Sequence, residues 1–205
     1  MLEMRYEIIE FSDINEKINS INEENNIERF IVPKSENNEK SRLRSAVGYM
    51  LMTKMLQDKG ITDFTLEKGE NGKPILTDTP YYFNISHSGN VVICVLSDSE
   101  VGVDIEEVKC TKNIENIAKR YFTEDEYNEV LGALDEEKYQ LFTRIWTEKE
   151  SYTKYLGLGI SKKFSEFYKD KLSGCVIDNG IDTKIKYSGG SIDKYLYSIC
   201  SKYVY

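Results

Sequence analysis

The chain has 205 residues, of which 40% are hydrophobic and 12% aromatic; this suits one ordinary domain or two small packed ones and argues against disorder. The formal net charge of −8 disfavours binding to nucleic acid or to an anionic membrane, although an acidic chain can still hold a local cationic pocket. The longest apolar run, residues 91–96, is far shorter than the roughly 20 residues of a membrane-spanning helix.

The N-terminal residues do not resemble a signal peptide, and both they and the cysteines lead us to expect a cytoplasmic protein. Cys94, Cys110, Cys175 and Cys200 are widely spaced and form no CxxC pair. We therefore expect reduced, mostly buried thiols in a cytoplasmic protein.

The first elements alternate between strand and helix patterns. Residues 5–11 have strand composition, residues 13–28 read as a mostly exposed helix, and residues 33–40 as a charged loop. Apolar residues recur at three- and four-residue spacing over 41–59, which predicts a helix that ends at Gly60.

Basic residues gather at the start of this second helix. Lys40, Arg42 and Arg44 form either a solvated basic turn or an anion site, and composition leaves both open. Residues 62–66 are a strand candidate, and a turn at 69–74 carries Lys73, which on its own is expected to be exposed.

Residues 83–106 carry the densest chemistry. The only histidine, His87, is placed in the opening turn, and the runs 91–96 and 101–105 are predicted to form a hairpin. The second run delivers Asp104 and Glu106, which share a face because residues i and i+2 of a strand point the same way. Two such carboxylates favour a hard divalent cation.

The remaining pattern is helical and then strand-like. It predicts helices at 113–121, 124–134 and 136–156, a short aromatic segment at 164–168, and strands at 184–187 and 195–200 around a turn at 188–190. A weak similarity between 195–201 and 91–97 favours two related halves.

The long third helix carries a second cluster. Trp146, Glu150 and Lys154 are four residues apart each time and form one stripe, either as a surface ion pair beside a core tryptophan or as part of a site. Glu148 and Lys149 are expected to project elsewhere into solvent, although Lys149 also has the reach to lean toward a bound phosphate.

The two clusters together indicate phosphoryl chemistry. Asp104, Glu106 and Glu150 supply hard oxygen ligands of the kind that Mg²⁺ prefers, and Lys154 would face a phosphate that lies on the ion.

Four motifs in this order resemble those of the 4′-phosphopantetheinyl transferases, across roughly residues 42–159. They are GKP at 72–74, FNISHSG at 83–89, VGVDIE at 101–106 and W-x-x-K-E-S-x-x-K at 146–154. Their spacing and the chain length resemble the monomeric type that activates peptide synthetases such as surfactin synthetase.

The resemblance implies a fold and a division of labour. The expected fold is α/β (α+β), with two similar α/β subdomains related by pseudo-twofold symmetry and the active site at their interface. Residues 1–103 would form the coenzyme A-binding half, and residues 104–205 the half with the metal ligands, the catalytic helix and the carrier-docking surface. A monomer is expected.

The resemblance also implies a reaction. Such enzymes transfer the 4′-phosphopantetheine arm of coenzyme A to a serine of an apo carrier protein and release adenosine 3′,5′-bisphosphate. By similarity, Asp104, Glu106 and Glu150 would bind Mg²⁺. Glu150, or a water on the ion, would accept the serine proton. Lys154 would stabilise the leaving phosphate.

The same resemblance assigns the coenzyme A contacts. His87, with Ser86 beside it, would bind the 3′-phosphate, and Arg44 and Lys73 the nucleotide phosphates or ribose. A lysine pair that often helps in this family has no clear counterpart, and Lys34 and Lys40 are the candidates.

The partner is expected to be a peptidyl, acyl or polyketide carrier protein, and the sequence does not select among them. Residues 157–171 mix lysines with aromatics, so we expect this segment, including Lys162 and Lys163, to form the docking edge. Two rival functions remain: a Mg²⁺-dependent hydrolase of a coenzyme A-like pyrophosphate, and a non-enzymatic coenzyme A- or nucleotide-binding module.

Overall fold

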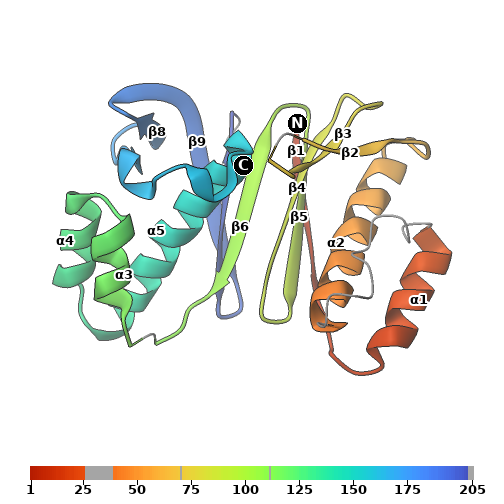
Figure 1. Ribbon diagram of the computed structural model, residues 1–205, viewed down its shortest axis with the longest axis horizontal. Coiled ribbons are helices and arrows are strands. Elements are labelled where there is room, and N and C mark those ends of the chain that lie inside the picture. Colours follow the sequence, from red (N-terminus) through yellow and green to blue (C-terminus); the bar gives the residue numbers. More distant parts are fainter. Residues whose placement is uncertain (26–38, 70, 111, 203–205) are drawn as a thin grey trace.

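A computed structural model describes residues 1–25, 39–69, 71–110 and 112–202. Two β-sheets pack face to face in the middle of the molecule, and helices cover the outer face of each sheet (Figure 1). The expected mixed α/β class is confirmed, whereas the pseudo-twofold relation between the halves stays a prediction.

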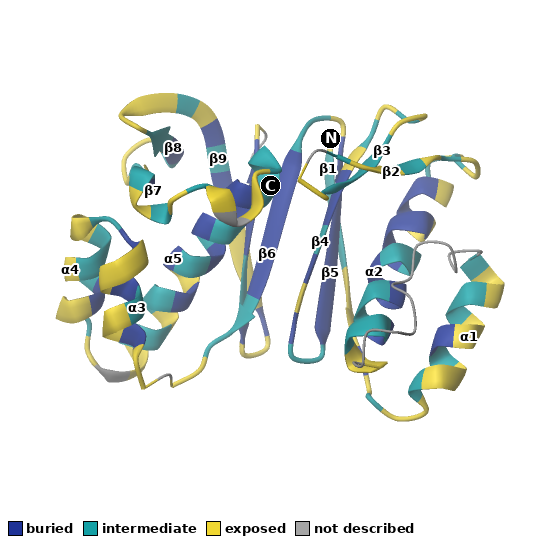
Figure 2. Ribbon diagram, in the orientation of Figure 1, coloured by how far each residue is buried: buried dark blue, intermediate teal, exposed yellow. Residues whose placement is uncertain are grey.

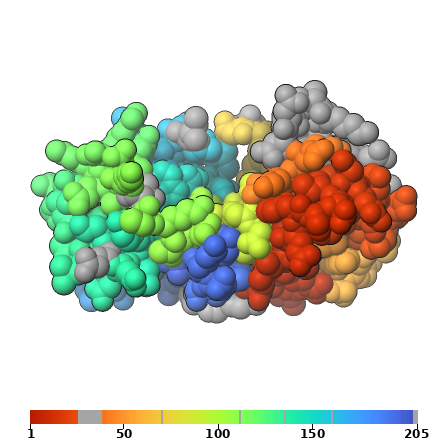
Figure 3. Space-filling view, turned by 90° about the horizontal axis from the view of Figure 1, so that it is seen from below, coloured from red at the N-terminus to blue at the C-terminus, as the bar shows by residue number. Residues whose placement is uncertain are grey.

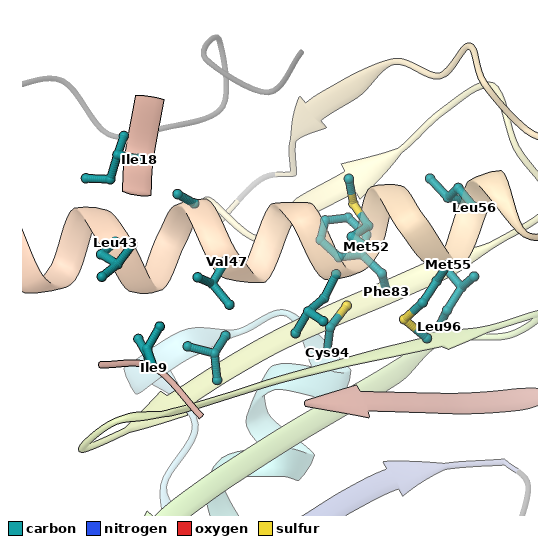
Figure 4. Close-up of a cluster of buried hydrophobic side chains, with 13 residues drawn as sticks. Ile9, Ile18, Leu43, Val47, Met52, Met55, Leu56, Phe83, Cys94 and Leu96 are labelled. Carbon is teal, nitrogen blue, oxygen red and sulfur yellow. The ribbon is translucent and has the colours of Figure 1, made fainter. Parts of the chain in front are cut away.

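The N-terminal half is built around a long helix on a three-stranded antiparallel sheet with the order β1-β5-β4. Its elements are β1 (Leu2–Ile8), α1 (Ile14–Asn25), α2 (Glu39–Gln57), β4 (Tyr82–Ser88) and β5 (Val91–Ser97). Figure 4 shows how α2 packs on this sheet through leucine, methionine and valine side chains against Phe83, Cys94 and Leu96. This apolar layer fixes α2, and with it Arg44, over β4.

The C-terminal half has the same plan with a larger sheet. Its helices are α3 (Ile114–Tyr121), α4 (Glu124–Gly132) and α5 (Asp135–Leu156), followed by the 3₁₀ turns η2 (Gly159–Ser161) and η3 (Phe164–Glu166). Among the described residues the sheet order is β6-β10-β9-β8-β7, from β6 (Val101–Glu107), β7 (Phe167–Lys169), β8 (Cys175–Asp178), β9 (Ile181–Ile192) and β10 (Tyr195–Ser201).

Another apolar layer lies between the two sheets. Alternate side chains of β5 and β6, such as Ile93 and Val103, meet there and are fully buried. Figure 2 shows β5 and β6 as the most buried strands of the molecule. Seen from below, the red N-terminal residues and the green residues of α3 lie on opposite sides, and the turns that precede β5 and β10 lie between them (Figure 3).

The predicted hairpin of 91–96 and 101–105 is wrong. In the part of the chain that is described, β5 pairs with β1 and β4, while β6 pairs with β10 in the other sheet. The connection over residues 98–100 therefore leads from one sheet to the other. The tight hairpin is β4–β5, so His87 lies in β4 and not in an opening turn.

Two further strand predictions need correction. The small hairpin of β2 (Leu66–Lys68) and β3 (Pro74–Leu76) replaces the strand expected at 62–66. The expected turn at 188–190 lies inside β9, and the chain reverses after Ile192. Gly189 is needed within the strand because a Cβ there would overlap the carbonyl oxygen of Tyr197.

The helix predictions are confirmed within a few residues. Thr123 and Glu126 form a complete capping box at the start of α4. Gly60 and Gly157 adopt positive φ angles of 77° and 68° just beyond α2 and α5, as C′ glycines do. Residues 26–38, which include most of the predicted loop 33–40 and Lys34, lie outside the described residues.

The cysteine prediction is also confirmed. All four thiols are free, and Cys94, Cys175 and Cys200 are buried whereas Cys110 is exposed. Among the described helices, none has the length and apolar character to cross a membrane.

Candidate active site

The site begins at a close contact between β6 and α5. A Cβ on Gly102 would overlap the backbone carbonyl oxygen of Ser151 and the backbone nitrogen of Tyr155, so only glycine lets the helix lie this near the strand. Asp104 is two residues further along the same face of β6. The glycine of the VGVDIE motif thus brings Glu150 and Lys154 of α5 within reach of that carboxylate.

Three of the sequence motifs meet at one salt bridge. Lys154 Nζ lies 2.6 Å from Asp104 Oδ1, in a pair whose carboxylate is nearly buried. Lys154 Nζ also donates to Ser86 Oγ at 2.9 Å, and Ser86 donates to Asp104 Oδ1 at 2.9 Å. Residues from β4, β6 and α5, up to 68 positions apart in the sequence, form one network.

The second carboxylate of β6 has its own partner from β4. Ser88 donates to Glu106 Oε2 at 2.8 Å, and its Oγ accepts from the backbone nitrogen of Glu107 at 3.2 Å. Ser88 and Asn84, which accepts from the Val103 nitrogen, were absent from the predicted site. The signal was available: polar residues alternate with other residues across FNISHSG, which marks one polar face of a strand.

The carboxylates influence one another as a shared cation site requires. Burial raises the pKa of Glu150 above its ordinary value, and the negative charge of Asp104 adds to the shift. Burial also raises the pKa of Glu106, against the opposing hydrogen bond from Ser88. Asp104 Oδ2 is buried without a hydrogen-bond partner. These are features of oxygen atoms that a divalent cation satisfies.

The three carboxylates do not form a closed ligand cage in this conformation. Across the described residues, no three Asp, Glu, His or Cys side chains are close enough to hold one ion together. Lys154 occupies one oxygen of Asp104 instead. Carboxylate oxygens are the donors that Mg²⁺ prefers, but the three side chains do not surround one point here, so the metal assignment of Asp104, Glu106 and Glu150 stays a prediction.

His87 and Arg44 lie together at the open end of β4. Arg44 donates from Nε and Nη2 to the carbonyl oxygen of Gly89, at 2.9 and 2.5 Å, and so braces the β4–β5 turn. Partial desolvation lowers the pKa of the exposed His87, and the positive charge of Arg44 lowers it further. Lys40, one helical turn before Arg44, shares the Phe11 ring with it.

Lys73 is bound elsewhere in the same region. Its ammonium pairs with Glu100 at 2.8 Å and donates to the carbonyl oxygens of Val101 and Tyr155. These contacts hold the β2–β3 hairpin against the start of β6 and the end of α5. They use all three donors of the lysine, so its nucleotide contact stays a prediction.

The expectation that Glu148 and Lys149 are solvated is wrong. Lys149 is 1% exposed, pairs with Glu126 Oε2 at 2.8 Å, and donates to the carbonyl oxygens of Phe164 and Phe167. Burial lowers the pKa of Lys149, and Glu126 opposes that shift. Glu148 is 12% exposed and pairs with Lys169. Lys149 therefore points away from Lys154 and ties α5 to α4 and to the chain after α5.

A cavity of about 220 Å³ opens beside Glu106. Trp146 and Phe142 of α5 form its aromatic wall, with ring centroids 5.9 Å apart, and Lys109 and Ile117 lie on the other side. Trp146, the first residue of the predicted stripe, thus lines this cavity and also contacts the rings of Tyr121, Phe122 and Phe164.

Of the two lysines expected at the docking edge, only one is free to contact a carrier protein. Lys162 is 12% exposed and pairs with Asp178 at 2.7 Å and with Glu166 at 3.2 Å. Lys163 is exposed. The charge of Lys162 is used in ion pairs within the chain, whereas the exposed charge of Lys163 can contact a carrier protein.

Comparison with known proteins covers the half of the chain that holds the carboxylates and α5. Residues 100–200 match the model of the 4′-phosphopantetheinyl transferase superfamily. The chain is 41% identical over 98 residues to 4′-phosphopantetheinyl transferase psf-1 of Bacillus pumilus, a match that covers 47% of this chain and 41% of that protein.

Two further relatives show the same pattern. Identity to 4′-phosphopantetheinyl transferase Sfp of Bacillus subtilis is 38% over 107 residues, or 52% of this chain and 47% of that protein. Identity to 4′-phosphopantetheinyl transferase gsp of Aneurinibacillus migulanus is 36% over 138 residues, or 65% and 56%. The chain spans about half the length of these curated relatives.

Proposed function

We propose that this chain is a 4′-phosphopantetheinyl transferase, as the match of residues 100–200 to that superfamily and the similarity to its named members suggest. It would transfer the 4′-phosphopantetheine arm of coenzyme A to a serine of an apo carrier protein, peptidyl or acyl. The products are the modified carrier and adenosine 3′,5′-bisphosphate. We propose further that it works as a monomer in the cytoplasm, a proposal that rests on the resemblance and on its four free cysteines.

One observation carries the proposal. Lys154, Asp104 and Ser86 are bound to one another although they come from three separate motifs. A cation, an acid and a hydroxyl from three elements converge where a pyrophosphate needs charge neutralisation. A protein that only bound a nucleotide would not need this set together with Glu106 and Glu150.

Asp104, Glu106 and Glu150 are the side chains that would hold Mg²⁺. The buried, unpartnered Oδ2 of Asp104 and the raised pKa of Glu150 support that assignment. When bound, the ion supplies charge neutralisation for the pyrophosphate oxygens.

The protein groups then account for the proton and the leaving group. The carrier serine Oγ forms a bond to the phosphorus that carries the pantetheine arm, and the bond from that phosphorus to the bridging pyrophosphate oxygen breaks. Glu150, or a water on the ion, would accept the serine proton, a role that carboxylates serve as general bases. Lys154 donates hydrogen bonds to the phosphate that leaves.

The 3′-phosphate of coenzyme A is assigned to the basic group at the end of β4. His87 is exposed there, Arg44 lies next to it, and Lys40 extends the positive charge by one helical turn. Lys73 and Ser86 are proposed to complete the nucleotide contacts. Ser86 would do so from its place between Lys154 and Asp104.

The test is intact-mass spectrometry of an apo carrier protein after incubation with this chain, coenzyme A and Mg²⁺. We expect the carrier to gain one phosphopantetheine, and to gain nothing with chelator or with Glu150→Ala. Peptidyl and acyl carriers are run in parallel, since the sequence does not choose between them. Release of adenosine 3′,5′-bisphosphate without a carrier would favour the hydrolase. Binding of coenzyme A without turnover would favour a binding module.

A further inference from the structure

The two halves of the molecule meet along a seam of side-chain hydrogen bonds. β4 lies beside β6 without a backbone ladder, because each belongs to a different sheet in the described chain (Figure 1). Asn84, Ser86 and Ser88 occupy alternate positions of β4, and each is at most 9% exposed. All three reach the edge of β6. We call these three residues the β4 seam.

The β4 seam covers an edge that would otherwise be open. Asn84 Oδ1 accepts from the Val103 nitrogen at 2.9 Å, and Ser88 Oγ accepts from the Glu107 nitrogen at 3.2 Å. These backbone donors have no backbone partner on a neighbouring strand and bond to side chains of β4 instead. The contacts advance in the same direction along both strands, so they set the register of one half against the other.

Ser88 stands apart from the other two residues in what it does to the site. Its hydroxyl donates to Glu106 Oε2 at 2.8 Å while it accepts from the backbone of the next residue. Glu106 is thus clamped on one oxygen, with its other oxygen left for a further partner. A hydroxyl that donates to a carboxylate favours its charged form, and this hydrogen bond lowers the pKa of Glu106 against the effect of burial.

We propose that Ser88 is a positioning residue that orients Glu106 toward the divalent cation, as an outer partner from the other half of the molecule. The inference rests on the proposed function, because it takes Glu106 as a metal ligand. Hydrogen-bond partners that orient a metal-ligating carboxylate typically change metal affinity by roughly 10- to 100-fold when removed. Ser88 therefore acts through Glu106, and the N-terminal half sets the affinity of a site whose carboxylates all belong to the C-terminal half.

The experiment measures Mn²⁺ binding directly, from the loss of the free-ion EPR signal, without coenzyme A or carrier. Ser88→Ala is compared with wild type and with Ser97→Ala. Ser97 is a matched control: it is 1% exposed, lies on β5, and its Oγ also accepts from a backbone nitrogen, that of Ser99 at 3.2 Å. Ser88→Cys keeps the size of the side chain with a weaker donor. Circular dichroism shows which variants fold.

We expect Ser88→Ala to weaken Mn²⁺ binding by roughly 10- to 100-fold. Ser88→Cys should fall between it and wild type, and Ser97→Ala should bind as wild type does. A folded Ser88→Ala or Ser88→Cys protein that binds Mn²⁺ like wild type would overturn the role of Ser88. An equal loss in Ser97→Ala would also overturn it, since the effect would then follow any buried serine.

The proposed function fails in a distinguishable way. If wild type binds no Mn²⁺ and modifies no carrier, the metal site itself is absent. If wild type binds Mn²⁺ and modifies carriers while Ser88→Ala does both equally well, the transferase stands and only the positioning role is lost.

Discussion

The two long helices, α2 and α5, each lie on a sheet but bury opposite kinds of side chain. The buried face of α2 is almost wholly apolar, with Leu43, Met52 and Leu56 at its centre. The buried positions of α5 include Ile145 and Tyr152 but also Lys149 and Thr147, which hydrogen-bond outside the helix, to the carbonyl oxygen of Phe164 and to Ser198. An apolar face tolerates small rotations of a helix, whereas a face of paired polar groups fixes one orientation. The helix that carries the reactive groups is the one so fixed.

The largest effect should come from the catalytic side of α5. Glu150→Gln removes the proposed base, so we expect the turnover number for carrier modification to fall by about 10²–10⁴. Met52→Ala on α2 should lower the melting temperature instead and leave the turnover number of the folded enzyme near wild type. Steady-state kinetics beside thermal melts separate the two; a Glu150→Gln enzyme with normal turnover would remove this residue from the mechanism.

The next largest effect, on the free energy of unfolding, should come from Lys149, the buried lysine of α5. Lys149→Met leaves the half-buried Glu126 carboxylate without its cation. Breaking a buried pair typically costs about 3–5 kcal/mol, and we expect less here because Thr123 still donates to Glu126. Chemical denaturation measures the free energy of unfolding. The double variant Lys149→Met with Glu126→Gln should recover part of the loss, because no unpaired charge remains. Equal stability of wild type and Lys149→Met would show that the pair does not stabilise the fold.

The helix–sheet contacts of the two halves provide a matched glycine pair. Gly102→Ala forces a Cβ into the backbone of α5, and we expect a loss of about 3 kcal/mol with weaker activity of what folds. Gly48→Ala meets only the side chain of Ile85, whose Cγ2 and Cδ1 atoms lie 2.7 and 3.2 Å from the added Cβ, and a side chain can move. Its loss should be about 1 kcal/mol. The comparison would break if Gly48→Ala were the more damaging of the two.

A smaller effect with a definite sign is expected from Glu106. Its pKa in the folded protein is raised above the ordinary value of 4.5, so the folded state loses stability as pH rises from there through the raised value. In chelator, Glu106→Gln should therefore melt at a higher temperature than wild type at pH 8 and no higher at pH 4. With Mg²⁺ the order should reverse. Differential scanning calorimetry at both pH values tests this.

The smallest effect concerns the carrier. Lys163→Glu should raise the carrier KM several-fold without changing coenzyme A binding, because carriers are acidic and Lys163 is exposed. Lys54→Glu, an exposed change on α2, is the control from the other half. Lys162→Glu is a poor probe, since it also breaks the pairs with Asp178 and Glu166. An unchanged KM in Lys163→Glu would rule out this docking edge.

The sequence alone predicted the positions of both long helices. The periodicity that predicted α2 and α5 is a local property, and the C′ glycines mark their ends, so both helices were placed within two residues. The convergence of Ser86, Asp104 and Lys154 agrees with the motif assignment. The metal ligands themselves stay a prediction.

The errors share a physical cause, which is that pairing depends on distant residues. Two apolar runs joined by a short polar turn are typical of a hairpin, yet β5 and β6 enter different sheets because β1 and β10 are better partners for them. A lysine is solvated by default, and the distant Glu126 and the carbonyl oxygens of Phe164 and Phe167 make the burial of Lys149 tolerable. Local patterns contain neither fact.

The connection between β5 and β6 has a consequence for how the enzyme is assembled. Every described strand of the first central sheet precedes residue 98, and every strand of the second follows residue 100. A single short link therefore joins two units that hold different groups of the proposed site: Arg44 and His87 in one, the three carboxylates and Lys154 in the other. Its role is to set a high effective concentration of each unit for its mate. Residues 98–100 thus keep the two halves of the proposed site together, as a covalent linker does for two separate proteins.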